Sequence, residues 1–482
     1  MNDIVPALRE IADRKGSFYL SELAENVDEA YKQHKAHFFD LDLYCTREGN
    51  DYHLRKISVE SLGRIGDISE LLPGKLPANV EAAIESYIKS KFGRGWNRGD
   101  SGQRLREAVM RQKERYWSAA AGKYSALDMA AYLLYHFPVY FCQFQYLLYD
   151  LLAGGLLKNK ICMADIGAGP GTITLAAMDF FSRLAGTGNK GNPVPILLKI
   201  VSVERSEEAI GCYRHLTSEL GTPNVLIEEP RRESVLSMKS DLPTDVDLVV
   251  FSNVLSELGD NQASRARAVT SLLKNANSNV TVMLIEPADR TNSTRLRATQ
   301  GMLMRKGFTL YSPCTMIWGR ACQPDNCWSF EDFGSIEAPG FMKKIAGAGE
   351  PYKYMNTDMK ASYAILRKDG TVKRPYRAMR TKFMPLSQLS KNTGKVVNIA
   401  VAIMSSNIGD ELDLLYKICD GSTPVPCYLA APRHHLSGSR KDILRAGYGD
   451  IVEVYCTLVR YNKKHNAYNM LVTGSTEVRL VV

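Results

Sequence analysis

The sequence lacks any apolar run of the roughly 18 residues that a membrane-spanning helix needs. Its most apolar stretch, 132–152, is interrupted by residues that a bilayer core disfavours: His136, Pro138, Gln143, Gln145 and Asp150. The opening residues 1–17 contain no basic segment followed by an apolar one, and they carry acidic residues, which is atypical of secretory and transit peptides. We therefore expect a cytoplasmic protein without a membrane partner.

Cysteine is also scarce, with ten residues in 482, so a disulfide-stabilised scaffold is excluded. Positive charge exceeds negative charge only slightly, because 61 Lys and Arg residues against 52 Asp and Glu residues give a net charge of +9. That excess is compatible with a nucleic-acid partner but does not require one. Because hydrophobic residues make up 45% of the chain, disorder over most of its length is excluded and a sizeable core is expected.

No internal repeat or long low-complexity tract is present, so the hydrophobic pattern has to divide the chain. Apolar residues recur at helical spacing in segments 26–40, 79–92, 101–121 and 126–153. We predict a helical N-terminal domain over residues 1–155.

The pattern then changes to strands alternating with helices, which indicates an α/β fold with a parallel sheet covered by helices on both faces. The expected strands are short apolar runs at 161–166, 197–203, 246–251, 280–285, 308–311 and 361–366. We assign this core to residues 156–370, including a cysteine-rich loop at 312–330.

The last part of the chain differs again. Residues 371–395 contain seven Lys and Arg residues and no Asp or Glu, which predicts a basic linker. Strand-like runs follow at 395–403, 412–418, 426–430, 451–459 and 468–481. These short runs predict a small β-barrel of the OB type over residues 396–482, with an embellished β-sandwich as the alternative.

A glycine-rich loop connects the first expected core strand to a helix. Its sequence over 164–172 is ADIGAGPGT, and glycines at alternate positions allow the backbone to pass close to a ligand. The next expected strand ends at Glu204, whose carboxylate could accept both hydroxyls of a ribose. The spacing is not the G-x-G-x-x-G of dinucleotide sites, and a turn without a ligand is the alternative.

This loop and Glu204 resemble the first two motifs of class I S-adenosylmethionine-dependent methyltransferases. The resemblance implies a Rossmann-like methyltransferase core and a cofactor site made of Asp165, Gly167, Ala168, Gly169, Pro170, Gly171, Thr172, Glu204 and Asn253. Segment 251–258, where such enzymes carry catalytic residues, has no N-P-P-[FY] motif, so no catalytic residue is assigned. Pro313-Cys314 resembles the dipeptide of cytosine-C5 enzymes, but it follows the wrong strand.

Three of the ten cysteines cluster in the spacing C-x7-C-x4-C at Cys314, Cys322 and Cys327. Thiolates this close together suit a soft metal centre, although the spacing is that of neither a zinc ribbon nor a ferredoxin. A distant fourth ligand would complete an iron–sulfur site, and the candidates are Cys419, Cys427 and Cys456, whereas a His would favour zinc. Cysteines in apolar or helical contexts are expected to be core residues: Cys45, Cys142, Cys162 and Cys212.

Together these motifs resemble the mitochondrial-type small-ribosomal-subunit methyltransferase-like family, which has bacterial and archaeal relatives. The matching segments are AYLLYHFPVYF (131–141), DIGAGPGT (165–172), DLVVFSNVLSEL (247–258), LIEPADRTNSTRLRATQGML (284–303), SPC…C…CWSF (312–330) and KASYAIL (360–366). The chain departs from the family in having Cys-Thr-Met where Cys-Pro-His is usual and in a longer C-terminal domain.

The resemblance implies an assembly factor that binds small-subunit rRNA and ribosomal proteins, rather than DNA, and holds a [4Fe-4S] cluster. Its first three ligands would be Cys314, Cys322 and Cys327. The fourth would be Cys419 rather than Cys427, because KICDG at 417–421 matches the family's strand and turn.

Basic residues fit an RNA partner. Arg94 and Arg98 flank Trp96, an arrangement that suits phosphate contact with base stacking. In the linker the candidate phosphate contacts are Arg374, Arg377, Arg380 and Lys382. A solvated helix face and a plain linker are the alternatives.

Three functions remain open from the sequence. The favoured one is a small-subunit assembly factor that binds S-adenosylmethionine, with methyl transfer doubtful because the catalytic motif is missing. The second is an active rRNA methyltransferase. The third is a small-molecule methyltransferase whose metal site is only structural, which the basic linker and the β-barrel disfavour.

Overall fold

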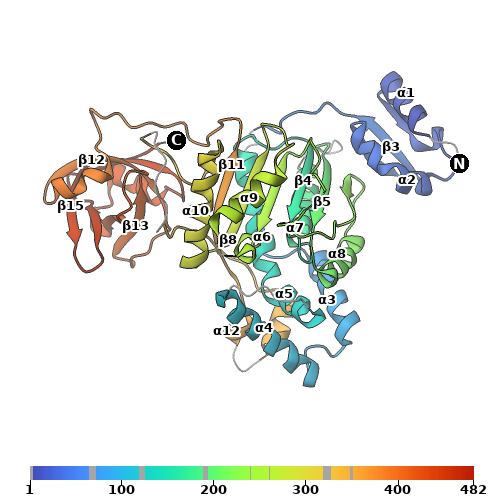
Figure 1. The fold of residues 1–482 in the computed structure, drawn as a ribbon, viewed down its shortest axis with the longest axis horizontal. Helices are drawn as coiled ribbons and strands as arrows, with labels where there is room; N and C mark the ends of the chain where they lie inside the picture. Colours follow the sequence, from blue (N-terminus) through green and yellow to red (C-terminus); the bar gives the residue numbers. More distant parts are fainter. Residues whose placement is uncertain are drawn as a thin grey trace. The chain divides into compact units, whose positions relative to one another are not determined.

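The computed structural model describes residues 4–63, 72–118, 125–187, 194–238, 240–259, 261–318, 327–347 and 351–481 (Figure 1). The chain forms two compact units. The first consists of Met1–Val250, Asn275–Asn277 and Gly334–Met359, and the second of Phe251–Lys274, Ser278–Phe333 and Lys360–Val482.

The first unit opens with a small mixed module. Its elements are α1 (Val5–Lys15), β1 (Ser17–Tyr19), the 3-10 turn η1 (Leu20–Glu22), α2 (Val27–Asp40), β2 (Leu43–Glu48) and β3 (Asp51–Lys56). The strands form an antiparallel sheet in the order β1-β3-β2. Helical periodicity predicts α2 but not these strands, although Tyr52 and Leu54 alternate inward along β3 as a half-buried strand requires.

A helical region follows, as expected. Its helices are α3 (Ala78–Phe92), α4 (Gly99–Ser118), α5 (Ala126–Tyr135) and α6 (Phe137–Ala153). Ser125 begins α5 in a capping box with Asp128. The single helix predicted over 126–153 is two helices, because Pro138 lacks the N–H that a continuous helix would use and stands in the first turn of α6.

The α/β core begins with two β-α-β units. They comprise β4 (Lys160–Ile166), α7 (Thr172–Ala185), β5 (Leu197–Val203), α8 (Glu207–Glu219) and β6 (Val225–Ile227). β4, β5 and β6 are parallel neighbours. α7 packs against β5, and α6 packs against α7, so the Leu-rich and Phe-rich helix α6 is buried along most of its length.

The remaining core elements are β7 (Leu248–Ser252), η3 (Leu255–Leu258), α9 (Gln262–Leu272), β8 (Thr281–Pro287), α10 (Arg290–Arg305), β9 (Thr309–Ser312), β10 (Glu331–Ser335), α11 (Gly340–Ala346), α12 (Pro351–Tyr354) and β11 (Asp358–Arg367). The strand order is β10-β11-β8-β7-β4-β5-β6, with β9 beside β11. The expected parallel sheet is mixed, because β11 runs antiparallel to both β8 and β9. An apolar run marks a buried strand but carries no information on its direction.

The C-terminal part of the second unit is a β-barrel. Its elements are η4 (Leu386–Asn392), β12 (Val396–Ile403), β13 (Asp413–Cys419), β14 (Cys427–Pro432), η5 (Arg433–His435), η6 (Gly438–Leu444), β15 (Ile451–Asn462), β16 (Ala467–Leu471) and β17 (Glu477–Val481). The strand order is β12-β13-β14-β16-β15, and pairing of β12 with β15 closes the ring. β14 and β16 are parallel, and β17 pairs with β15.

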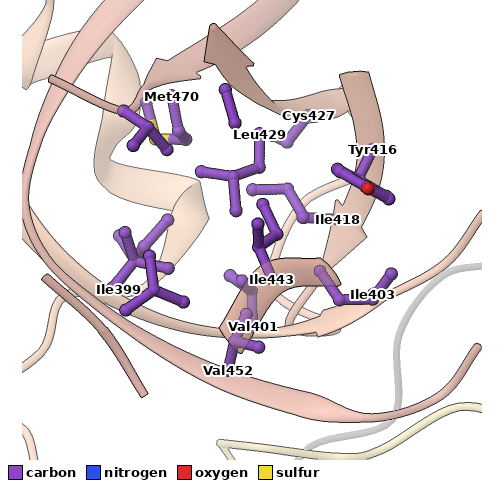
Figure 2. Close-up of a cluster of buried hydrophobic side chains, with 14 of the residues drawn as sticks. Ile399, Val401, Ile403, Tyr416, Ile418, Cys427, Leu429, Ile443, Val452 and Met470 are labelled. Carbon is purple, nitrogen blue, oxygen red and sulfur yellow. The ribbon is translucent and has the colours of Figure 1, made fainter. Parts of the chain in front are cut away.

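Aliphatic side chains from every strand fill this barrel (Figure 2). Ile399, Val401 and Ile403 point inward from β12, and Ile443 of η6 is fully buried among the strand side chains. The predicted strand over 468–481 is two strands separated by a turn that Thr473 and Thr476 close with hydrogen bonds. The α/β methyltransferase-like core, the N-terminal helical region and the C-terminal barrel therefore agree with the fold class predicted from the sequence.

Candidate cofactor loop and cysteine site

The loop between β4 and α7 can be built only with glycine at alternate positions. Gly167, Gly169 and Gly171 all have positive φ, at 74°, 55° and 90°. A Cβ atom on Gly171 would also lie 2.8 Å from the ring of Tyr213. The backbone of this loop is consequently bare where the sequence predicts a ligand.

Asp165 fixes the loop to the helix that follows it. The carboxylate is buried and accepts hydrogen bonds from the backbone N–H of Thr174 at 3.2 Å and from the Thr174 hydroxyl at 2.8 Å. Burial raises the pKa of Asp165 to about 7. In this structure Asp165 therefore positions the loop from within the core.

Glu204 holds the other side of the same loop. The Gly169 N–H donates to one carboxylate oxygen at 3.0 Å, and the Ser206 N–H donates to the other at 2.7 Å. Each oxygen retains a second acceptor position. Glu204 can therefore fix the loop and still accept a hydrogen bond from a ligand hydroxyl.

In the second unit, segment 251–258 is held by a residue that sequence reasoning missed. Asn253 has φ at +55°, and its backbone N–H donates to Ile285 O at 2.8 Å. Glu286 is fully buried at the end of β8 and accepts from Leu255 N–H at 2.9 Å. Burial raises the pKa of Glu286 to about 7. The sequence did contain a signal for Glu286, because it is the one acidic residue near the end of the otherwise apolar strand β8.

Cysteines from distant parts of the chain meet around one cavity in the second unit. Cys314 follows β9, Cys327 precedes β10, and Cys419 ends β13, yet all three line a cavity of about 70 Å³. Cys322 lies outside the described residues. Burial raises the pKa of the Cys314 and Cys419 thiols, and the neighbouring cysteines raise both further.

The three candidates for the fourth ligand differ in where their side chains lie. Cys427 also borders the cavity, but it packs in the barrel core and its thiol donates to Val425 O at 3.4 Å. Cys456 is exposed. Only Cys419 of these three interacts with both Cys314 and Cys327 in the described part of the chain.

Buried polar groups hold the turn that follows Cys419. Asp420 is buried and accepts hydrogen bonds from Trp318 Nε1 at 2.8 Å and from Leu386 N–H at 2.7 Å. The Gly421 N–H points to the Cys419 sulfur at 3.3 Å. Backbone N–H groups directed at a cysteine sulfur favour its thiolate form.

No group of three or more His, Cys, Asp or Glu side chains stands in metal-binding geometry within the described ranges, which omit 319–326 and with it Cys322. The donor set nevertheless fits a soft metal centre, because the described part of the site offers thiols and neighbouring cations rather than carboxylates. The single cysteines Cys45, Cys142, Cys162 and Cys212 are buried, as expected for core residues.

The basic residues proposed for RNA fall into two groups. Trp96 is 2% exposed, because its indole is part of the core. The prediction that Trp96 stacks on a base is therefore wrong. Arg94 and Arg98 beside it are exposed. In the linker Arg374 forms an ion pair with Asp450. The other three candidates of the linker, Arg377, Arg380 and Lys382, are exposed.

Within the described residues, no helix combines the length and the hydrophobicity that crossing a bilayer requires.

Comparisons with known proteins match two parts of the chain to families. Residues 126–327 match the family described as "Mitochondrial small ribosomal subunit Rsm22", and residues 387–481 match the C-terminal domain of a domain of unknown function, DUF8157. The resemblance inferred from the sequence motifs is confirmed over the first of these ranges. No curated protein matches the chain.

Solved structures that match parts of the chain share little sequence with it. An S-adenosylmethionine-dependent methyltransferase from Clostridium acetobutylicum is 9% identical over 30% of this chain and 50% of its own, with a TM-score of 0.23. The YcgJ protein from Bacillus subtilis is 12% identical over 43% of this chain and 92% of its own, with a TM-score of 0.24. The p204 HINb domain is 12% identical over 21% of this chain, with a TM-score of 0.17, and the match spans about half of that domain, 48%.

The two buried carboxyl groups predict how stability changes with pH. Both hold a proton in the native state that the unfolded chain loses above its ordinary pKa of about 4, so the free energy of unfolding should fall as pH rises from about 4 to 7. Asp165→Asn and Glu286→Gln should each flatten this slope, by on the order of 1 kcal/mol per pH unit. Denaturant unfolding at several pH values measures the effect, with the exposed Asp100→Asn as control. An unchanged slope in the double variant would contradict the assignment.

Proposed function

We propose that this chain is an assembly or maturation factor of the small ribosomal subunit. The proposal starts from the match of residues 126–327 to the family described as "Mitochondrial small ribosomal subunit Rsm22". In this proposal it binds rRNA and ribosomal proteins, binds S-adenosylmethionine at the glycine loop, and holds a [4Fe-4S] cluster. The observation that carries the proposal is the meeting of Cys314, Cys327 and Cys419 around one cavity, as the family resemblance requires.

The proposed cluster has as ligands Cys314, Cys322, Cys327 and Cys419. When bound, such a cluster supplies four metal–thiolate bonds and one-electron redox chemistry. Cys314 and Cys327 would hold the cluster at the two ends of the segment between β9 and β10. Cys419 would bind it from the end of β13 in the barrel. Metal binding would deprotonate these thiols, and burial opposes this at Cys314 and Cys419, where it raises the pKa.

The proposed S-adenosylmethionine site comprises Asp165, Gly167, Ala168, Gly169, Pro170, Gly171, Thr172, Glu204 and Asn253. The loop lies at the carboxyl end of β4, where ligands of open α/β sheets bind. Gly169 leaves open space beside the loop, because nothing lies within 4 Å of the position a Cβ would take there, and Glu204 keeps acceptor capacity for ribose hydroxyls. Methyl transfer is not part of the proposal, because no catalytic group is assigned.

For RNA, the barrel supports an OB-type assignment. The closed order β12-β13-β14-β16-β15, in which β14 and β16 are parallel, is the strand order of OB-folds. Many OB-folds bind single-stranded nucleic acid. Exposed Arg377, Arg380 and Lys382 precede it directly. The division of the chain into 1–155, 156–370, 371–395 and 396–482 stays a prediction.

The cluster assignment predicts a loss that is specific to one cysteine. Cys419→Ser should remove most of the iron, the sulfide and the visible absorbance after anaerobic purification, because a ligand is lost. Cys427→Ser and Cys456→Ser, which remove a core thiol and an exposed thiol, should retain them. Full iron and sulfide in Cys419→Ser would overturn the four-ligand set. A colourless protein with one zinc per chain would replace the cluster with a zinc site.

The cofactor assignment predicts that Gly169→Asp weakens S-adenosylmethionine binding by at least about a hundredfold, or about 2.7 kcal/mol. The new carboxylate would stand beside Glu204 at a backbone position with φ of +55°. Isothermal calorimetry measures the affinity. Gly211→Asp on the exposed face of α8 introduces the same group elsewhere and should leave the affinity unchanged. Equal affinities in the two variants would refute the site.

For RNA, reversing Arg377, Arg380 and Lys382 to Glu should weaken binding to transcribed small-subunit rRNA. The salt dependence should also become shallower, by about one unit of the log–log slope per lost phosphate contact. The matched control reverses three exposed charges of the N-terminal module, Arg9, Arg14 and Lys32. If both triple variants show the wild-type slope, the linker does not track phosphates.

A further inference from the structure

Arg297 is a cation in the interior of the second unit. It lies on α10, its exposure is 0%, and it lines the same cavity as Cys314, Cys327 and Cys419. An arginine side chain stays charged in a protein. Its charge therefore has to be balanced inside the fold.

Every hydrogen-bond acceptor that the structure gives Arg297 is neutral. Nη1 donates to Gln300 Oε1 and to Tyr363 O, each at 2.8 Å. Nη2 donates to Ser329 O and to the Tyr448 hydroxyl, each at 3.3 Å. Nε is buried without a partner. In the described part of the chain no carboxylate pairs with this guanidinium, so its polar contacts leave the positive charge uncompensated.

A second buried arginine of the same unit shows the usual solution. Arg367, at the end of β11, donates from Nε to Asp369 at 3.0 Å and forms an ion pair with it. Burying a charge without such a partner costs several kcal/mol. Among the described residues, which omit 319–326, Arg297 has no equivalent of Asp369, and an anion in the cavity would compensate its charge.

The groups available to be that anion are the cysteines. Cys314 and Cys327 line the same cavity as the guanidinium, and negative charge on their sulfur atoms would raise the pKa of Arg297. Gln300, one turn after Arg297 on α10, directs its side chain to Cys314 as well. Lys417 adds a second positive charge two residues before Cys419, and its ammonium is held by the Trp328 carbonyl.

We propose that Arg297 is the counter-cation of a negatively charged metal–thiolate centre in this cavity, and that it positions the ligands without binding the metal. The inference rests on the proposed function, since it presumes a centre on Cys314, Cys327 and Cys419. Four thiolates around a [4Fe-4S] core of charge +2, or around Zn²⁺, carry a net charge of −2. The guanidinium offsets part of that charge and fixes the cavity wall through β11 and the Tyr448 hydroxyl.

For an iron–sulfur centre the charge has a measurable consequence. Reduction adds one negative charge, which a nearby cation stabilises, so Arg297 raises the reduction potential. Arg297→Gln should shift the midpoint potential to more negative values by about 59 mV, equivalent to a tenfold change in a one-electron equilibrium. Arg297→Lys retains the charge and should stay near the wild-type potential. Arg305→Gln, on the exposed end of the same helix, is the control and should not shift.

The experiment is anaerobic purification of these proteins, iron and sulfide analysis, and a redox titration followed by electron paramagnetic resonance. A fully loaded Arg297→Gln protein with the wild-type potential overturns the inference and leaves the cluster assignment intact. A wild-type protein without iron overturns the proposed cluster itself. If that protein carries zinc instead, chelation should lower the melting temperature of wild type more than that of Arg297→Gln, and equal losses would overturn the inference.

A measurement on the wild type covers the case in which Arg297→Gln does not fold. With ¹⁵N-arginine incorporated, pulsed electron paramagnetic resonance of the reduced cluster should detect a weakly coupled ¹⁵N nucleus. Arg297 is the arginine among the described residues that line the cavity, so the coupling should disappear in Arg297→Lys, which carries no guanidinium. Absence of the coupling in a loaded wild-type protein would contradict the placement.

Discussion

The alternation of side chains along β13 determines which cysteine of the C-terminal barrel lies beside Cys314 and Cys327. Successive residues of a strand point to opposite faces, so Ile418 packs in the barrel core, at the border of the cavity, while Cys419 lies on the other face of β13. The same rule, one strand further on, places Cys427 in the core. A register shift of one residue would exchange these roles, and the thiols of Cys314 and Cys327 would lose their partner on the barrel.

A buried charge network connects this strand to the methyltransferase-like core of the same unit. Arg297 on α10 donates to Tyr363 of β11 and to Tyr448, which precedes β15 of the barrel. Asp420 draws Trp318 and Leu386 onto the turn after β13. Since buried polar groups need hydrogen-bond partners, these contacts define the cavity wall on which Cys314 and Cys419 lie, while the charge of Arg297 stays uncompensated by them.

The linker 371–395 and the segment 94–98 show how far residue type alone predicts which side chains are exposed to an RNA partner. In the linker, charge density correctly marks exposed side chains at Arg377 and Arg380, but Arg374 is paired with Asp450, which lies 76 positions later in the sequence. Near Trp96 the aromatic residue is buried and its arginine neighbours are exposed. Composition predicts which residues can reach a phosphate, whereas ion pairs and burial decide which of them are free to do so.

By itself the sequence determined the α/β core, the glycine loop and the strands of the barrel, because these follow from local periodicity and from backbone conformations that only glycine adopts readily. It also limited the fourth cysteine to three candidates. Among those three, the family resemblance favoured Cys419, but only the tertiary structure shows that Cys419 shares a cavity with Cys314 and Cys327. The tertiary structure also reversed the direction of β11 and placed Arg297 beside the thiols with no carboxylate partner among the described residues. The physical reason is that pairing direction, strand register and charge compensation depend on residues far apart in the sequence.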